Sequence, residues 1–245
     1  MTCTRRPLLV AAIVGLALGP RIARAGDTVR GSGVATTQRR EIGAFTGIAL
    51  GAPVAVVLRA ANRESIEIVG DDNILPLIET RLTGSGSGRT LEIVLPRNTR
   101  IEPRTPVVVT VDYVHVDALA VGGSGRISSN GMKAGKLAAS IGGSGTMTLA
   151  GLQADQLDVA VGGSGNVNTD GRARKLSVSI AGSGACEAER LIAGDVAVSM
   201  AGSGSARVHA ETSLRASIVG NGDVLYSGPA TPQASIVGSG RLRRL

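Results

Sequence analysis

The chain has 245 residues, of which 35 are glycine and only three are aromatic, namely Phe45, Tyr113 and Tyr226. So few aromatic side chains cannot build the stacking platforms on which bases or sugars bind. The formal net charge of +7 falls to about +3 without the first 25 residues, because these hold four of the 26 basic residues and none of the 19 acidic ones; so small an excess excludes a basic stripe for nucleic acid.

The first 25 residues predict a secretory signal peptide. "MTCTRRPLLVAAIVGLALGPRIARA" combines a basic start, an apolar run too short to span a bilayer, and a small-x-small cleavage signal. We expect cleavage between Ala25 and Gly26 and export to the periplasm, the outer surface or the extracellular space. General secretion is favoured, although the Arg5-Arg6 pair also permits twin-arginine export. No further transmembrane segment is expected, and Cys186 is the only cysteine left, which excludes an intramolecular disulfide.

Residues 26–40 predict an irregular leader, and residues 41–116 predict a less regular β region. Stretches such as "FTGIALGAPVAVVLRA", "SIEIVG", "TLEIVLP" and "VVVTVDYVHV" alternate apolar and other residues between Gly or Pro boundaries, as strands do. "DDNILPLIE" favours one short helical turn capped by Asp71 or Asp72. Because no flexible linker precedes Val121, we expect residues 41–245 to form a single domain.

Residues 117–245 contain a repeat. Seven Gly-x-Gly motifs recur every 18 to 20 residues, and aliphatic residues stand three and five positions before each centre and three positions after it. Such alternation predicts strands with one buried face. The motif centres are Ser124, Ser144, Ser164, Ser183, Ser203, Asn221 and Ser239.

This repeat predicts a parallel β-solenoid of about seven coils, with right-handed coiling by analogy with parallel crossovers. Twenty residues are too few for an added helix or for a propeller blade. The glycines would form a sharp corner that L-residues adopt at a cost, with the central side chains hydrogen-bonded along the stack. The corner glycines are Gly123, Gly125, Gly143, Gly145, Gly163, Gly165, Gly182, Gly184, Gly202, Gly204, Gly220, Gly222, Gly238 and Gly240.

The order of these motifs resembles the head GIN domain family of putative auto-transporter adhesins. The resemblance lies in "FTGIALGAPVAVVLRA", "SIEIVGDDNILPLIETRL", "RTLEIVLP" and the serial "VGGSGRI"-type motifs, and it covers roughly residues 40–240. It implies an exported all-β solenoid with a role in adhesion, and it carries over no catalytic residue. The scarcity of aromatic residues and the basic end are departures from the family.

One outward stripe of small residues is a candidate interaction surface. It stands four positions before each motif centre and faces away from the predicted core. Two interpretations stay open: another part of the chain or flat stacking requires small residues there, or a partner docks on them. The stripe consists of Ala120, Ser140, Ala160, Ser179, Ser199, Ser217 and Ser235.

No catalytic, cofactor-binding or metal-binding residue is expected. His209 with Glu211 would be only half of a metal site, and Cys186 takes an inward slot. Parallel β-helices can carry sugar-cleaving enzymes that use paired carboxylates, but the candidates here stand at unrelated offsets. These candidates are Asp155, Asp158, Asp170, Glu187 and Glu189.

We therefore expect an exported, non-enzymatic cell-envelope protein whose partner is an unidentified protein or cell-surface ligand, with self-association as a further option. The alternatives are a carbohydrate-active lyase or hydrolase on the same scaffold and a purely structural periplasmic module. At the far end, "GRLRRL" (residues 240–245) is expected to cap the solenoid, with Leu242 closing the core and three arginines guarding the edge. A basic patch for anionic lipid is the competing interpretation of these arginines.

Overall fold

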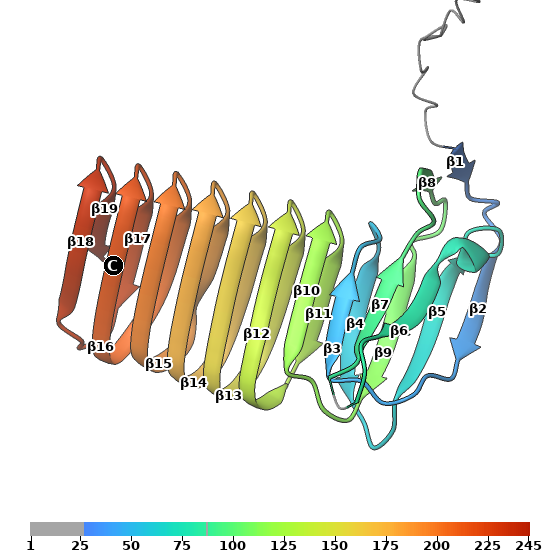
Figure 1. Ribbon diagram of the computed structural model, residues 1–245, viewed down its shortest axis with the longest axis horizontal. Helices are drawn as coiled ribbons and strands as arrows, with labels where there is room; N and C mark the ends of the chain where they lie inside the picture. Colours follow the sequence, from blue (N-terminus) through green and yellow to red (C-terminus); the bar gives the residue numbers. More distant parts are fainter. Residues whose placement is uncertain (1–26, 87) are drawn as a thin grey trace, which may run out of the picture.

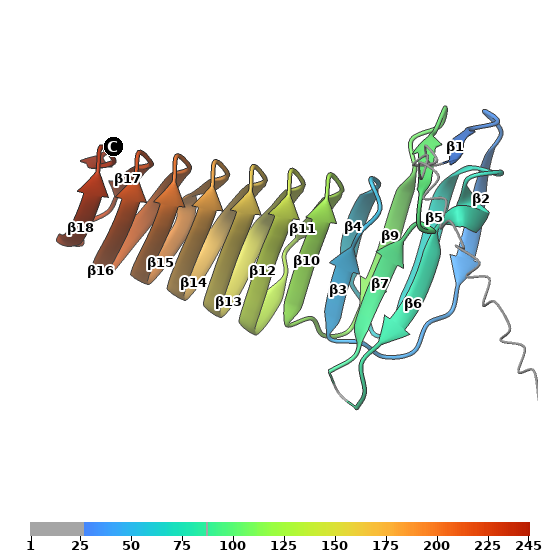
Figure 2. The ribbon, with the colours of Figure 1, turned by 45° about the horizontal axis from the view of Figure 1, so that its top comes forward.

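The computed structural model describes residues 27–86 and 88–245, and it confirms an all-β protein built on a parallel β-solenoid. Figures 1 and 2 show the coils as a straight stack, with the less regular β region at one end and the last coil at the other. The predicted cleavage site, Ala25-Gly26, lies outside the described residues.

The front region, residues 27–116, contains nine strands and one 3₁₀ turn. They are β1 (Asp27–Arg30), β2 (Ala35–Arg40), β3 (Gly47–Leu50), β4 (Ala55–Ala60), β5 (Ser65–Asp71), η1 (Leu75–Leu77), β6 (Glu79–Thr83), β7 (Thr90–Val94), β8 (Thr99–Glu102) and β9 (Val108–Tyr113). The repeats contain β10 (Ala118–Gly123), β11 (Arg126–Asn130), β12 (Lys133–Gly143), β13 (Thr146–Gly163), β14 (Asn166–Gly182), β15 (Ala185–Gly202), β16 (Ser205–Gly220), β17 (Asp223–Ser227), β18 (Pro232–Gly238) and β19 (Arg241–Arg244).

Successive coils pair in parallel and in register, so that each repeat position forms a column along the stack. Val121 pairs with Ile141, and Ile141 pairs with Val161, as the repeat offsets require. The seven corners are joined by six complete turns, so the solenoid has about six turns and not seven. Strands β13 to β16 each run from one corner to the next, and register shifts mark the looser turn between them.

The corners show why glycine recurs on both flanks. The first glycine of every corner has a φ between 109° and 134°, the left-handed region that L-residues avoid. At the second glycine, an added Cβ would lie 2.6–2.9 Å from a backbone carbonyl oxygen of the preceding coil. The coils therefore stack backbone on backbone at the corner.

The predicted ladder of central side chains is wrong. The central residues are exposed, and among the described residues their side chains form no hydrogen bonds with one another. Instead, the backbone N–H of each central residue from Ser144 onward donates to the carbonyl of the first corner glycine in the preceding coil, as Ser164 does to Gly143 at 2.9 Å. Backbone hydrogen bonds therefore link the corners along the stack, and they already satisfy the N–H groups of these central residues.

The predicted inward slots form the core around the first six of the seven corners, where every one of them is buried. In the last coil the prediction fails: Ile236 is 39% exposed, Ala234 is exposed and Leu242 is half-buried. Leu242 packs against the core but stays half-buried, so it covers the core only in part. No coil covers these side chains in the described structure, since β18 and β19 are the last strands of the stack.

The front region extends the stack by a coil without a Gly-x-Gly motif. Strand β3 pairs in parallel with β10, and β4 pairs with β11, so residues 51–54 form a corner against residues 122–125. Ile48, Leu50 and Val56 are buried in the same columns as the repeat aliphatics. Beyond this coil, β7 and β9 continue the parallel stack, while β6, β5 and β2 pair antiparallel.

The described part of the predicted irregular leader, residues 27–40, instead forms two strands. β1 pairs in parallel with β8, and β2 pairs antiparallel with β5. Residues of β2 are mostly exposed, so the strand carries no hydrophobic period that the sequence could reveal. The predicted helical turn exists as η1, but Ile74 is its N-cap, with no side-chain bond. Asp71 binds other backbone groups instead.

Candidate interaction surfaces

The predicted stripe lies on the outer side of β10, β12 to β16 and β18. Six of its seven residues are exposed, and Ala120, next to the front region, is half-buried. The front region stacks on the end of the solenoid and leaves this side open (Figure 1). We call these seven stripe residues the small-residue face.

The small-residue face contains a shallow groove of about 470 Å³ that crosses four coils. Its lining comes from residues 177–179, 197–199, 215–217 and 233–235. Because these strands run in parallel and in register, Ser179, Ser199 and Ser217 form one row at the spacing of the strands, about 4.8 Å, and the longer side chains of Arg215 and Gln233 also line the groove. Such a surface allows close approach of a flat or extended partner.

A second groove, of about 910 Å³, follows the looser turns of the coils. Lys133, Arg172 and Arg174 line it together with Asp155 and Asp195. Arg174 is paired with Asp155 at 2.9 Å, so part of this charge is already neutralised. The groove is polar and of mixed charge.

The carboxylates considered for sugar cleavage are separated. Asp155 pairs with Arg174 and Asp158 with Lys136, while Glu187 lies 3.5 Å from Arg207. Asp170 accepts a hydrogen bond from the Gly151 N–H at 2.6 Å, and Glu189 lies near Glu187 in a small groove. Glu187 and Glu189 share that small groove with Arg190, whereas Asp155, Asp158 and Asp170 are bound to other partners, and the enzyme alternative finds no support in this geometry.

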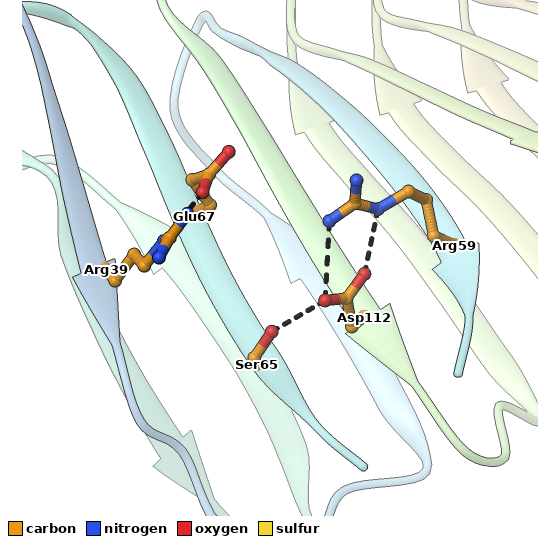
Figure 3. A network of polar contacts seen from close by, with 5 residues as sticks. All are labelled: Arg39, Arg59, Ser65, Glu67 and Asp112. Atoms are coloured by element: carbon orange, nitrogen blue, oxygen red, sulfur yellow. Dashed lines mark hydrogen bonds and ion pairs between the residues drawn. The ribbon is translucent and has the colours of Figure 1, made fainter. Parts of the chain in front are cut away.

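A polar network in the front region was not foreseen from the sequence. Figure 3 shows Arg39 beside Glu67, and Arg59 and Ser65 both bound to Asp112. These pairs stand directly opposite one another on β2, β5, β9 and β4. Only the strand register could have revealed them, because the partners are 28 to 53 residues apart in the sequence.

This network lines a groove of about 700 Å³ that gathers four arginines and four carboxylates. Burial raises the pKa of Asp112, but the hydrogen bonds from Ser65 and Arg59 and the nearby guanidinium charges outweigh it and hold the pKa below its ordinary value. General acids in sugar cleavage need a raised pKa. The network therefore joins strands, and Asp112 lacks the raised pKa that such an acid needs.

The two remaining candidate residues are His209 and Cys186. His209 lies between Ser227 and Glu211, at 2.8 Å from each, and no group of three potential metal ligands occurs among residues 27–86 and 88–245. Cys186 is fully buried, and burial, together with the charge of Glu187, raises the pKa of its thiol to about 12. A thiol in that state is a poor nucleophile. In the same described ranges, no helix is long and apolar enough to cross a membrane.

Comparison with known proteins gives one family and several similar structures. The family model described as "Putative auto-transporter adhesin, head GIN domain" matches residues 44–230. A structure of a putative adhesin from Bacteroides fragilis is 23% identical with a TM-score of 0.82, covering 89% of this chain and 100% of that one. No curated protein matches the chain.

Two further similar structures come from Parabacteroides species. A putative lipid binding protein from Parabacteroides distasonis is 21% identical with a TM-score of 0.71, and it covers 89% of this chain and 100% of its own. A putative adhesin from Parabacteroides merdae is 22% identical with a TM-score of 0.67, with coverage of 89% and 99%. At these identities the likeness shows a shared fold.

Proposed function

Because the chain belongs to the head GIN domain family of putative auto-transporter adhesins, we propose that it is an exported, non-enzymatic cell-envelope protein that acts in surface interaction or adhesion. The family and the fold of the similar structures support this proposal at the level of an adhesin-like solenoid. The partner would be a protein or another ligand at a cell surface.

The observation that carries the proposal is the open small-residue face. A soluble fold normally places long charged side chains on exposed strands, which oppose edge and face association. Here consecutive coils expose Ser179, Ser199 and Ser217 in one row, and the front region leaves them uncovered. A face of this kind allows a partner to approach the sheet closely over several coils.

Two measurements test the proposal. Antibody or protease added to intact producing cells should reach the native protein, and detection only after lysis and only in the cytoplasm would contradict export. Beads coated with purified protein should adhere to intact cells. The triple variant Ser179→Arg, Ser199→Arg and Ser217→Arg should reduce this adhesion at least tenfold, because the arginines block close approach.

The matched control carries the same three changes on the corners of the same stack. Ser164, Ser183 and Ser203 are also exposed, so their replacement by Arg adds equal charge without touching the small-residue face. This control should adhere as the unmodified protein does. A purely structural module would give no adhesion of the wild-type beads, and that result would refute the proposal.

A further inference from the structure

The outer side of the repeat strands is a flat sheet that the described part of the chain leaves open (Figure 1). We call it the outer sheet. It consists of the outward residues in the ranges 138–142, 158–162, 177–181, 197–201, 215–219 and 233–237, which belong to β12, β13, β14, β15, β16 and β18. In-register pairing arranges these residues in three rows along the stack, and the middle row belongs to the small-residue face.

The row beside the corners runs from glycine through alanine to valine. Gly142 and Gly162 occupy it on β12 and β13, whereas Val219 and Val237 on β16 and β18 are 54% and 65% exposed. The fold itself does not require these two glycines, because an added Cβ would meet nothing within 4 Å at Gly142 and only one carbonyl oxygen, at 3.8 Å, at Gly162. Glycine inside a strand weakens it and marks places where another backbone or a ligand approaches closely. The row therefore offers bare backbone at one end and protruding apolar side chains at the other.

The row on the other side of the small-residue face carries one acid and one base. The Asp158 carboxylate on β13 is held by Lys136 at 3.3 Å and by Gln156 at 3.0 Å, and its side chain stays 33% exposed. Arg215 on β16 is exposed and has no ion-pair partner among residues 27–86 and 88–245. The two residues stand three strands apart in one row, about 14 Å at the spacing of strands. They therefore do not pair with each other within one chain.

A two-fold axis along the strands, midway between β14 and β15, matches both rows to themselves. Rotation about this axis lays the outer sheet of one copy on that of another, with the position along each strand kept and the order of the strands reversed. Strand β13 of each copy then faces β16 of the other, and β12 faces β18. Asp158 lies opposite Arg215, Val219 lies over Gly162, and Val237 lies over the glycine of β12. Every such contact occurs twice.

The charges at the margin of the outer sheet select this axis. Lys175 on β14 and Asp195 on β15 are exposed neighbours, two positions before the outer sheet, and the axis between them sets each lysine opposite the aspartate of the other copy. An axis centred on β14 would set Lys175 against its own copy, and an axis centred on β15 would do the same to Asp195. An axis along the stack would set Asp158 opposite Gly162, which offers no cation. Like charges opposite one another are costly, so the axis between β14 and β15 is favoured.

The size of the outer sheet suits such an interface. Six strands at about 4.8 Å and seven residues at about 3.3 Å, with the margin included, give roughly 29 Å by 23 Å. Pairing two copies then covers about 1,300 Å² in total, at the lower end of the range for specific protein interfaces. The small side chains of the middle row let the two sheets come closer than the about 10 Å of ordinary sheet packing, so the charged side chains can meet.

We propose that the outer sheet binds the outer sheet of a second copy of this chain about the axis between β14 and β15. The partner of the small-residue face is then the same protein, and adhesion joins two surfaces that both carry it. This inference rests on the proposed function for the use of that face, and it names the partner that the proposed function leaves open.

Charge reversal tests the pairing. Sedimentation velocity of the unmodified protein should show a concentration-dependent dimer. Arg215→Glu and Asp158→Lys should each raise the dissociation constant at least tenfold, because each variant alone sets like charges opposite one another. An equimolar mixture of the two variants should dimerise again, because Asp158 then faces Arg215 on one side and the two introduced charges face each other on the other side. The control Arg126→Glu changes an exposed arginine on β11, beyond the corner, and should dimerise as the unmodified protein does.

Three results would overturn the proposal: a monomer at every concentration at which the unmodified protein is soluble, a dimer that neither variant weakens, or two folded variants that stay monomeric when mixed. Thermal unfolding shows whether each variant is folded.

A glycine variant tests the close approach without touching the charge pairs. Gly142→Arg fits the single chain, because nothing lies within 4 Å of an added Cβ, but in the dimer it occupies the place of Val237. It should therefore weaken the dimer at least tenfold with an unchanged melting temperature of the monomer. Gly135→Arg is the matched control, since an added Cβ there also meets nothing within 4 Å and the residue lies outside the outer sheet. Equal dimerisation of the two glycine variants would overturn the proposed register.

Beads separate this inference from the proposed function. Beads coated with the Arg215→Glu protein should adhere to beads coated with the Asp158→Lys protein at least tenfold more than either kind adheres to itself. Adhesion to cells that lack the protein, if Gly142→Arg leaves it unchanged, would keep the proposed function and overturn the self-pairing. A dimer in solution without any adhesion of beads or cells would support the self-pairing and contradict the proposed function.

Discussion

Asp71 connects three segments of the front region through one carboxylate. The side chain is fully buried, and it accepts hydrogen bonds from the N–H groups of Gly33, Arg104 and Thr105 at 2.8–3.3 Å. At Gly31, an added Cβ would collide with the same carboxylate. A buried acid with several backbone donors therefore explains why the polar leader is ordered as strands.

Replacing Asp71 by Asn should lower the melting temperature by several degrees at pH 7, because an amide group turns N–H donors toward the backbone donors. Burial raises the pKa of Asp71, but the hydrogen bonds from Thr105, Arg104 and Gly33 outweigh it, so the net pKa lies below the ordinary 3.8. The stabilisation is thus present above about pH 4 and is lost as pH falls through the lowered pKa.

Thermal unfolding of both proteins between pH 7 and pH 2 measures this effect. The difference in melting temperature should be constant down to about pH 4 and should shrink below it. Asp72→Asn, at the exposed neighbouring position, is the control and should change little. A difference that is the same at pH 7 and pH 2 would show that the carboxylate charge is not responsible.

Thr169 places a hydroxyl group without a hydrogen-bond partner in the core of the described structure. It is 5% exposed, its Oγ1 has no hydrogen-bond partner in the described structure, and its partner across the coils, Leu149, is fully buried. Thr169→Val keeps the shape and removes the unsatisfied group, so the free energy of unfolding should rise by about 1 kcal/mol. Urea denaturation measures it. Thr148→Val on the half-buried outer side should leave stability nearly unchanged, and a loss of stability in Thr169→Val would indicate a hidden partner.

At the scale of the element, the glycine and the serine of one corner should contribute differently to stability. Gly163 has a φ of 118°, and an added Cβ would lie 2.7 Å from the Gly143 carbonyl oxygen. Gly163→Val should therefore cost more than about 2 kcal/mol, whereas Ser164→Ala should stay within about 0.5 kcal/mol because its backbone bond remains. Denaturant unfolding compares them, with Gly163→Ala in reserve if the valine variant does not fold. Equal losses would refute the corner geometry.

The elements differ in how far the sequence predicts them. Repeat strands were predictable because period two and a fixed offset coincide in every coil. The coil of β3 and β4 was not predicted as a repeat, because it has no Gly-x-Gly motif. Its residues Ile48, Leu50 and Val56 nevertheless have the repeat offsets around Pro53. Strand β2 was not predicted, because both its faces are polar and exposed.

The candidate surfaces were predictable only in part. The stripe follows directly from the period, because a strand that buries alternate residues must expose the others. Its open state depends on where the front region lies, which no local pattern encodes. The ionic network around Asp112 depends on the register between distant strands, which is parallel for β4 with β9 and antiparallel for β5 with β9.

At the scale of the whole molecule, the stack is asymmetric. The core runs without a break from Phe45 to Ala230, so each inner coil is covered by a coil on both sides. The front end carries the antiparallel strands β2, β5 and β6, whereas among the described residues the last coil, β18 and β19, pairs only in parallel with the coil before it. In a repeat array, stability comes from the interfaces between neighbours. Equivalent residues should therefore contribute unequally along the stack.

Ile180 and Ile236 test this gradient, because they occupy the same repeat slot with exposures of 1% and 39%. Ile180→Ala leaves a cavity between two coils and should cost about 2–5 kcal/mol. Ile236→Ala removes a side chain that one coil contacts, so the loss should stay below about 1 kcal/mol. Urea unfolding of both variants at low protein concentration measures the difference. Equal losses would mean that the last coil is covered in solution, whereas the expected difference would show that a neighbour on both sides is what makes the inner position costly to empty.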